Sequence, residues 1–240
     1  MNLQVRAWAF VPARGGSKSI QKKNIVSLGH RPMIEYGVRA AQLSGRFERI
    51  ICSTDDPEIA EVCKKYGASV PFLRPKELAE DKTSHVPVMQ HAVNFFEKEK
   101  NCKVDVVVVL QPTSPFRTAE DLDKTLEKLI ETGADSAVSL VEISENHPMK
   151  IKKLEGDRVL AYSIEEVEGT RRQDLPTAYK RSGAVYAMTR ETLMDKNKLY
   201  GDFITGFVVP QERSVDIDEP FDWVKTEYML EKLKEKGYEF

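Results

Sequence analysis

Residues 7–18 read AWAFVPARGGSK, an apolar run followed directly by two glycines, a serine and two cations. A short apolar run that ends in a Gly/Ser loop is typical of a β-strand leading into a ligand-binding turn. Gly15 and Gly16 let the backbone approach an anion closely and present N–H groups to it. Arg14 and Lys18 add positive charge, with Arg able to fork around two oxygens. The loop therefore predicts a polyphosphate site.

The loop matches neither of the two common nucleotide-binding fingerprints. The Walker pattern needs a second glycine followed by Lys and Ser/Thr, and the dinucleotide pattern needs three spaced glycines. Gly15-Gly16 is a single pair. A solvated basic turn is the alternative to a phosphate loop at this point.

Strands and helices alternate along most of the chain. Periodicity predicts helices at 33–41, 58–66, 86–100, 119–131 and 220–236, and apolar runs predict strands at 49–55, 104–110, 136–142, 183–188 and 205–209. Repeated β–α units indicate an α/β fold with a mostly parallel, doubly wound sheet. The alternation breaks at about 145–181, which is polar and carries short strand-like pieces. We expect a single domain over 1–240 with an inserted arm at about 145–181.

Composition excludes several classes of protein. Charged residues make up 31% of the 240 residues and the net charge is −2, so there is no basic excess for a nucleic-acid surface. No apolar run approaches the roughly 20 residues of a membrane span, and the N-terminus lacks the layout of a signal peptide. Three widely spaced cysteines indicate reduced thiols. We expect a cytoplasmic protein without a nucleic-acid or membrane partner.

Two carboxylates, Asp216 and Asp218, follow the last predicted strand. In an extended chain, residues i and i+2 point to the same face, so both side chains can reach one cation. Carboxylate oxygens suit Mg²⁺ or Mn²⁺ together with substrate phosphates. The alternative is an acidic cap for the final helix, which explains Asp218 and Glu219 equally well.

Another polar run, QPTSPFR at 111–117, follows the strongest strand. A turn that caps the next helix through Thr118 explains part of this run. Ligands gather beyond the carboxyl ends of strands in an open parallel sheet. The run is therefore also a candidate for ligand binding.

Residues 12–24, PARGGSKSIQKKN, resemble the signature loop of the acylneuraminate cytidylyltransferases, and the runs at 111–117 and 214–222 resemble two further motifs of that family in the same order. The resemblance covers nearly the whole chain. It implies a Rossmann-like nucleotidyltransferase fold and a reaction of CTP with a nonulosonic acid that gives a CMP-sugar and pyrophosphate. It also implies a homodimer in which the arm packs against the partner subunit.

The resemblance assigns roles to individual residues. Nucleotide binding falls to Ala13, Arg14, Gly15, Ser17, Lys23, Asn24, Arg74 and Ser84. The acceptor sugar falls to Gln111, Arg117, Lys150, Arg172 and Lys180, and the Mg²⁺ or Mn²⁺ ion to Asp216 and Asp218. Arg14, Lys23, Asp216 and Asp218 are the expected catalytic residues. Simpler roles stay open: a helix start and cap for Arg74 and Ser84, a loop anchor for Arg117, and a solvated basic face for Lys150 and Arg172.

The identity of the acceptor stays open as well. Family members that recognise N-acetylneuraminic acid carry Arg and Asn where this chain has Lys180 and Ser182. Lys cannot fork a carboxylate as Arg does. N-acetylneuraminate or legionaminate is the first expectation and pseudaminate the alternative. A nucleotide-sugar glycosyltransferase and a catalytically silent sensor are more distant rivals.

Overall fold

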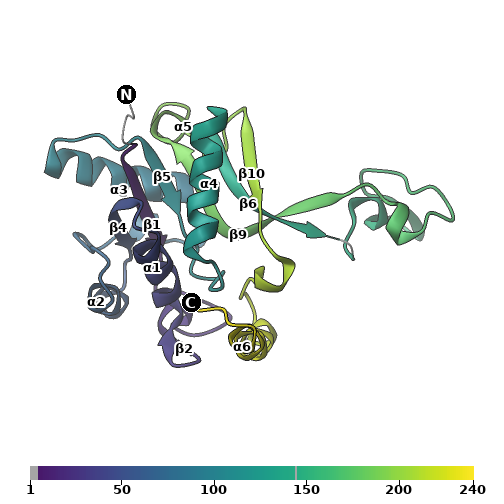
Figure 1. The fold of residues 1–240 in the computed structure, drawn as a ribbon, viewed down its shortest axis with the longest axis horizontal. Coiled ribbons are helices and arrows are strands. Elements are labelled where there is room, and N and C mark those ends of the chain that lie inside the picture. The colour runs from purple at the N-terminus through teal and green to yellow at the C-terminus, as the bar shows by residue number, and fades with distance from the viewer. Residues whose placement is uncertain (1–4, 144) are drawn as a thin grey trace.

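The computed structural model describes residues 5–143 and 145–240, and a six-stranded sheet in the order β10-β6-β9-β5-β1-β4 forms its centre (Figure 1). The strands are β1 Ala7–Pro12, β4 Phe47–Ser53, β5 Val106–Val109, β6 Ser136–Ile143, β9 Ala178–Thr189 and β10 Ile204–Val208. β1 is parallel to β4 and β5, and β10 is parallel to β6. β9 runs antiparallel to both of its neighbours. The prediction of a mostly parallel sheet is confirmed.

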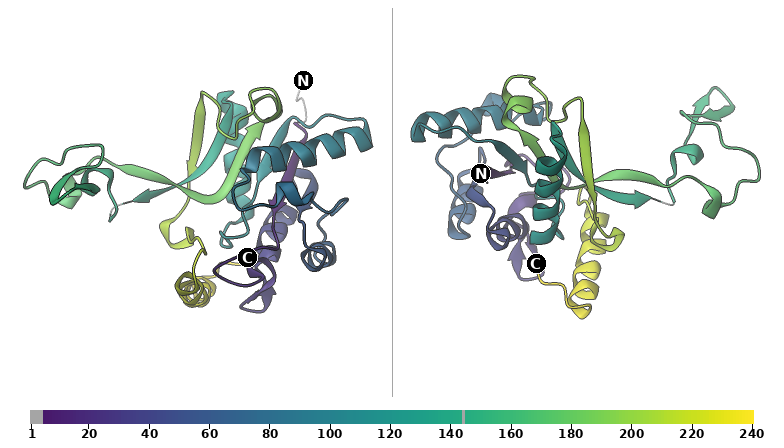
Figure 2. Two further views of the ribbon diagram at one scale, coloured as in Figure 1. Left: turned by 180° about the vertical axis from the view of Figure 1, so that it is seen from behind. Right: turned by 45° about the horizontal axis from the view of Figure 1, so that its top comes forward.

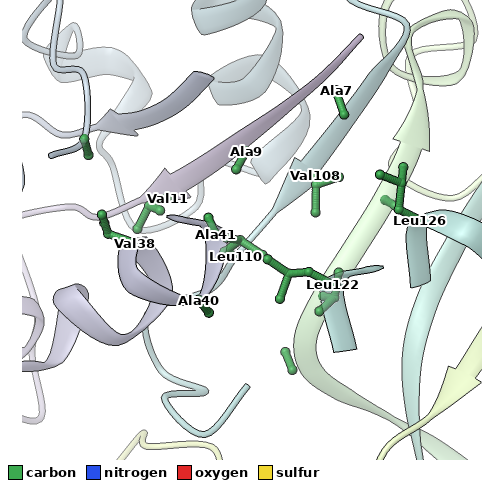
Figure 3. Packing of buried hydrophobic residues seen from close by; sticks show 14 of the residues in the cluster. Ala7, Ala9, Val11, Val38, Ala40, Ala41, Val108, Leu110, Leu122 and Leu126 are labelled. Atoms are coloured by element: carbon green, nitrogen blue, oxygen red, sulfur yellow. The ribbon is translucent and has the colours of Figure 1, made fainter. Parts of the chain in front are cut away.

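Helices cover both faces of this sheet. They are α1 Met33–Ser44, α2 Pro57–Lys65, α3 His85–Lys100, α4 Ala119–Thr132, α5 Arg190–Met194 and α6 Pro220–Glu235. Alternate residues of β1 enter different cores: Ala9 and Val11 pack with α1, α2 and α4, whereas Trp8 and Phe10 pack with α3 and α5. Figure 3 shows Val11 close to the α1 residue Val38. The sheet is doubly wound, as predicted.

A third core holds the C-terminal helix against the end of the sheet. Leu230 and Leu233 of α6 pack there with Phe116, Val215 and Ile217. The short strands β2 Ser27–Leu28 and β3 Arg31–Pro32 form a hairpin beside them. This core fixes the segment that carries the two predicted metal-binding aspartates.

The predicted helix signals act as expected. The Asp56 side chain accepts hydrogen bonds from the first turn of α2, with Pro57 at the first helical position. Thr118 and Asp121 form a capping box at the start of α4. Gly133, with φ 63°, ends α4 in the left-handed conformation that glycine adopts readily.

β6 and β9 continue past the sheet as a two-stranded ribbon, in which Ile143 pairs with Ala178. The ribbon leads to a hairpin of β7 Lys152–Glu155 and β8 Arg158–Ala161, and the whole arm projects away from the body (Figures 1 and 2). β9 starts earlier than the predicted strand at 183–188. The first residues of β9 fall within the predicted arm because their polar sequence does not indicate a buried strand. They are polar because this part of the ribbon is exposed. Within the described residues, no helix has the length and apolar character needed to cross a bilayer.

Candidate active site

A cavity of about 530 Å³ opens at the edge where β1 and β5 end. Parallel strands end at the same edge, so the loops that follow them meet there. The predicted site residues that line it are Arg14, Ser17, Lys23, Asn24, Arg74, Ser84, Gln111, Asp216 and Asp218. Four separate segments of the chain thus converge on one cavity.

The loop after β1 is held by its neighbours. The Gly15 N–H donates to Asp55 Oδ1 at 3.0 Å, and Asn24 Nδ2 donates to the Arg14 carbonyl at 3.0 Å. A Cβ at Gly15 would lie 2.8 Å from the Asp56 Cβ, so only glycine fits there. Ala13 is buried and its N–H donates to the Ser53 carbonyl. Ala13 and Gly15 shape the loop without lining the cavity.

One carboxylate binds two cations of this loop. Arg14 Nη1 donates to Asp81 Oδ1 at 2.6 Å, and the Lys18 ammonium pairs with Asp81 Oδ2. Hydrogen bonds from Lys18 and Arg14 lower the pKa of Asp81, which therefore stays charged at neutral pH. Asp81 also lines the cavity. Both cations are therefore paired with a carboxylate at the cavity in this structure.

Lys23 joins the loop to the acidic segment. Its Nζ donates to the Ile217 carbonyl at 2.7 Å and lies 3.5 Å from Asp218 Oδ1. The Ser19 hydroxyl donates to the Asp218 carbonyl nearby. The ammonium therefore sits between the predicted phosphate loop and the two aspartates.

Asp216 and Asp218 both face the cavity, while the side chain of Ile217 between them is fully buried. The predicted alternation is thus observed. Asp216 is exposed on its cavity side, yet desolvation by the surrounding protein raises its pKa, and a hydrogen bond with the Thr113 side chain partly offsets this effect. Glu219 is the N-cap of α6 and forms a capping box with Asp222, whose carboxylate also accepts a hydrogen bond from the Asp218 N–H. The cap therefore leaves both cavity carboxylates unused.

The other end of the cavity combines polar and apolar groups. Arg74 is buried and its Nε donates to Ser53 Oγ at 3.1 Å. Ser84 precedes α3 as its N-cap, yet its side chain makes no capping hydrogen bond. His85 also lines this end, and burial lowers its pKa, so its imidazole is neutral at pH 7. His85 was not predicted from the sequence, in which its position next to Ser84 is the one signal for it.

Four predicted sugar-binding residues lie outside the cavity lining. Arg117 is only 2% exposed, and it donates to the Gln111 carbonyl from beneath the loop. Burial lowers its pKa to about 9. This placement favours a loop anchor. Lys150, Arg172 and Lys180 lie on the arm.

Ser182 does not face the cavity either. Its hydroxyl is buried and donates to Ser139 Oγ at 2.7 Å, and that oxygen also accepts the Val185 N–H at 2.8 Å. Ser182 therefore bonds within the sheet, and it does not line the cavity.

Comparisons with known proteins agree with this geometry. A family model described as Cytidylyltransferase matches residues 8–208. The CMP-N,N′-diacetyllegionaminic acid synthase of Legionella pneumophila is 34% identical over 96% of this chain and 99% of its own length. The pseudaminic acid cytidylyltransferase of Campylobacter jejuni is 33% identical over 87% of this chain and 89% of its own.

A solved structure shares the fold. CMP:2-keto-3-deoxy-manno-octonic acid synthetase, complexed with CTP, superposes with a TM-score of 0.71 over 95% of this chain and 99% of that one, at 18% identity. The family model spans most of the chain, and both relatives align along most of its length. The chain therefore belongs to the CMP-nonulosonic acid cytidylyltransferase family.

Proposed function

We propose that this chain transfers CMP from CTP to a nonulosonic acid and releases pyrophosphate. The observation that carries the proposal is one cavity that faces both the cations Arg14 and Lys23 and the carboxylates Asp216 and Asp218. The relatives named for legionaminic and pseudaminic acids support this class of acceptor. Both acids, and N-acetylneuraminic acid, are candidates for this chain.

The reaction sets an electrostatic problem. The hydroxyl on the anomeric carbon of the sugar acid attacks the α-phosphorus of CTP, and the bond to the pyrophosphate oxygen breaks. An anionic acceptor must approach an anionic phosphate, so positioning and charge neutralisation carry most of the catalysis. Arg14, Lys18 and Lys23 would bind the triphosphate and stabilise the leaving pyrophosphate.

Asp216 and Asp218 fit a Mg²⁺ or Mn²⁺ ion. The described residues contain no cluster of three or more His, Cys, Asp or Glu side chains that could enclose a metal ion. Mg²⁺ commonly binds one or two carboxylates and completes its shell with waters and substrate phosphates. Burial also raises the pKa of Asp216, a cost that a nearby cation would offset. When bound, the ion would neutralise charge at the α-phosphate.

The arm supports a homodimer with shared sites. Leu154 and Val167 on the arm are 73% and 70% exposed, as expected of a surface that packs against another subunit. Lys150, Arg172 and Lys180 would then reach the partner's cavity, and not the cavity of their own subunit.

A cytoplasmic location fits the cysteines. Cys52, Cys63 and Cys102 are all free thiols. The hydrogen bond with Cys63, together with burial, raises the pKa of Cys52 and keeps it protonated. Reduced thiols in contact are typical of reducing compartments.

The direct test is pyrophosphate release with CTP and Mg²⁺ against N-acetylneuraminic, legionaminic, pseudaminic and 3-deoxy-octulosonic acids. Release with at least one nine-carbon acid is expected. Free CMP formed from a supplied CMP-sugar would instead favour a glycosyltransferase. A chain that binds CTP but releases no pyrophosphate with any of these acids would contradict the proposed acceptor class.

Replacement of Asp216 separates catalysis from stability. The pKa of Asp216 is raised in the folded protein above its ordinary value of 3.8. As the pH rises above about 4, the carboxyl group therefore ionises more readily in the unfolded chain than in the folded one, and this difference lowers the stability of the fold. Asp216→Asn should raise Tm at pH 7, with the gain vanishing below about pH 4. It should also lower kcat by about 10²-fold or more.

Asp222→Asn is the matched control for this variant. Hydrogen bonds from the N–H groups of Glu219 and Asp218 lower the pKa of Asp222, so its carboxylate stabilises the fold above its unfolded pKa. Asp222→Asn should lower Tm at pH 7, and the loss should fade as the pH falls through the lowered pKa.

An Asp216→Asn variant that turns over normally at saturating Mg²⁺ would refute the metal assignment.

Subunit mixing tests the shared site. Lys150→Ala and Asp216→Asn chains, each inactive alone, should recover about a quarter of wild-type activity when co-expressed, because half of the random dimers then hold one intact site. Size-exclusion chromatography with light scattering checks the assembly. A dimer that recovers no activity on mixing would contradict a contribution of Lys150 to the partner's site.

A further inference from the structure

A buried ion pair lies behind the two loops that face the cavity. Arg213 ends the 3₁₀ turn η5, Gln211–Arg213, and Asp121 lies in the first turn of α4. They are only 8% and 1% exposed. Arg213 Nη2 donates to Asp121 Oδ1 at 2.8 Å, and Nη1 donates to Oδ2. The two side chains thus form a forked pair.

The same guanidinium reaches the loop that precedes α4. Arg213 Nη1 lies 3.3 Å from the Phe116 carbonyl and 3.5 Å from Thr118 Oγ1. The Tyr238 ring covers the guanidinium at 5.5 Å. Phe116 and Thr118 belong to the loop that carries Gln111, and Arg213 comes three residues before Asp216. The Arg213 side chain therefore connects the Gln111 loop to the Asp216 segment on the buried side, away from the cavity.

At the cavity the two segments meet at Thr113. The Ile217 N–H donates to the Thr113 carbonyl at 2.9 Å, and the Thr113 side chain bonds to Asp216. The place of Asp216 therefore depends on how far the two segments lie from each other. Arg213 and Asp121 fix that separation on the buried side.

We propose that Arg213, through its ion pair with Asp121, is a positioning residue that holds the Asp216–Asp218 segment against the Thr113 loop for the cytidylyl transfer. The inference rests on the proposed function for its catalytic consequence. A buried ion pair contributes little net stability after desolvation, and well-packed apolar residues often replace one without loss. The fixed geometry of the Arg213–Asp121 pair, and not its stabilising energy, is therefore what positions the Asp216 segment.

A second fork supplies a matched control. Arg190 donates to both oxygens of Glu97, at 2.8 and 2.9 Å, and joins the first residue of α5 to α3. Neither residue lines the cavity. Arg190→Lys therefore breaks a fork of the same chemistry, more exposed than the Arg213–Asp121 fork, outside the cavity lining.

The first readout is hydrogen exchange at the Ile217 amide, which needs neither substrate nor metal. Arg213→Lys keeps the charge but cannot form the fork. We expect exchange at Ile217 to become at least about tenfold faster in this variant, and to stay unchanged in Arg190→Lys. Because this readout requires no turnover, it decides the positioning role even if the proposed reaction is wrong.

The second readout is steady-state kinetics. We expect kcat to fall about tenfold or more, with KM for CTP within about twofold, because misplacement of Asp216 acts on the transition state. Asp121→Asn keeps one hydrogen bond and the helix cap, and it should show the same pattern in a milder form if Arg213→Lys fails to fold. Unchanged Ile217 exchange, or unchanged kcat despite faster exchange, would overturn the proposal.

Discussion

Opposite charges that face one cavity are the constraint on which this site depends. Arg14 and Lys18 are held by Asp81, and Lys23 lies beside Asp218. These charges come from segments that are far apart in sequence, and each is stabilised by a partner from another segment. Polar groups that are fixed before the ligand arrives need little reorganisation during the reaction. The charged groups of the free site are thus already held in place by contacts within the protein.

The sheet makes this arrangement possible. β1 lies between β4 and β5 in parallel, so the phosphate loop and the Gln111 loop leave the sheet at the same edge. The Asp216–Asp218 segment does not follow a strand of the parallel group. It is held at this edge of the sheet by the third core, in which Val215 and Ile217 pack against α6 and Phe116. The buried Arg213–Asp121 pair then joins this segment to the start of α4.

Local sequence pattern was sufficient to predict most of the strands and helices, and the alternation of side chains in the Asp216–Asp218 segment. The alternation that points Asp216 and Asp218 to one side, with Ile217 inward, follows from strand geometry and is observed. Contacts between distant segments were beyond local pattern. The Asp81 pairing spans 67 residues, and the inward turn of Arg117 depends on packing beneath its loop. The same limit applies to the early, polar start of β9 on the exposed ribbon.

If the cavity binds CTP as proposed, the triphosphate must compete with Asp81 for Arg14 and Lys18. A crystal structure of the chain with Mg²⁺ and a non-hydrolysable CTP analogue tests it most directly. We expect triphosphate oxygens to replace Asp81 as partners of Arg14 and Lys18, with Asp216 and Asp218 holding the metal ion. A nucleotide bound elsewhere, while Arg14 stays paired with Asp81, would contradict the account.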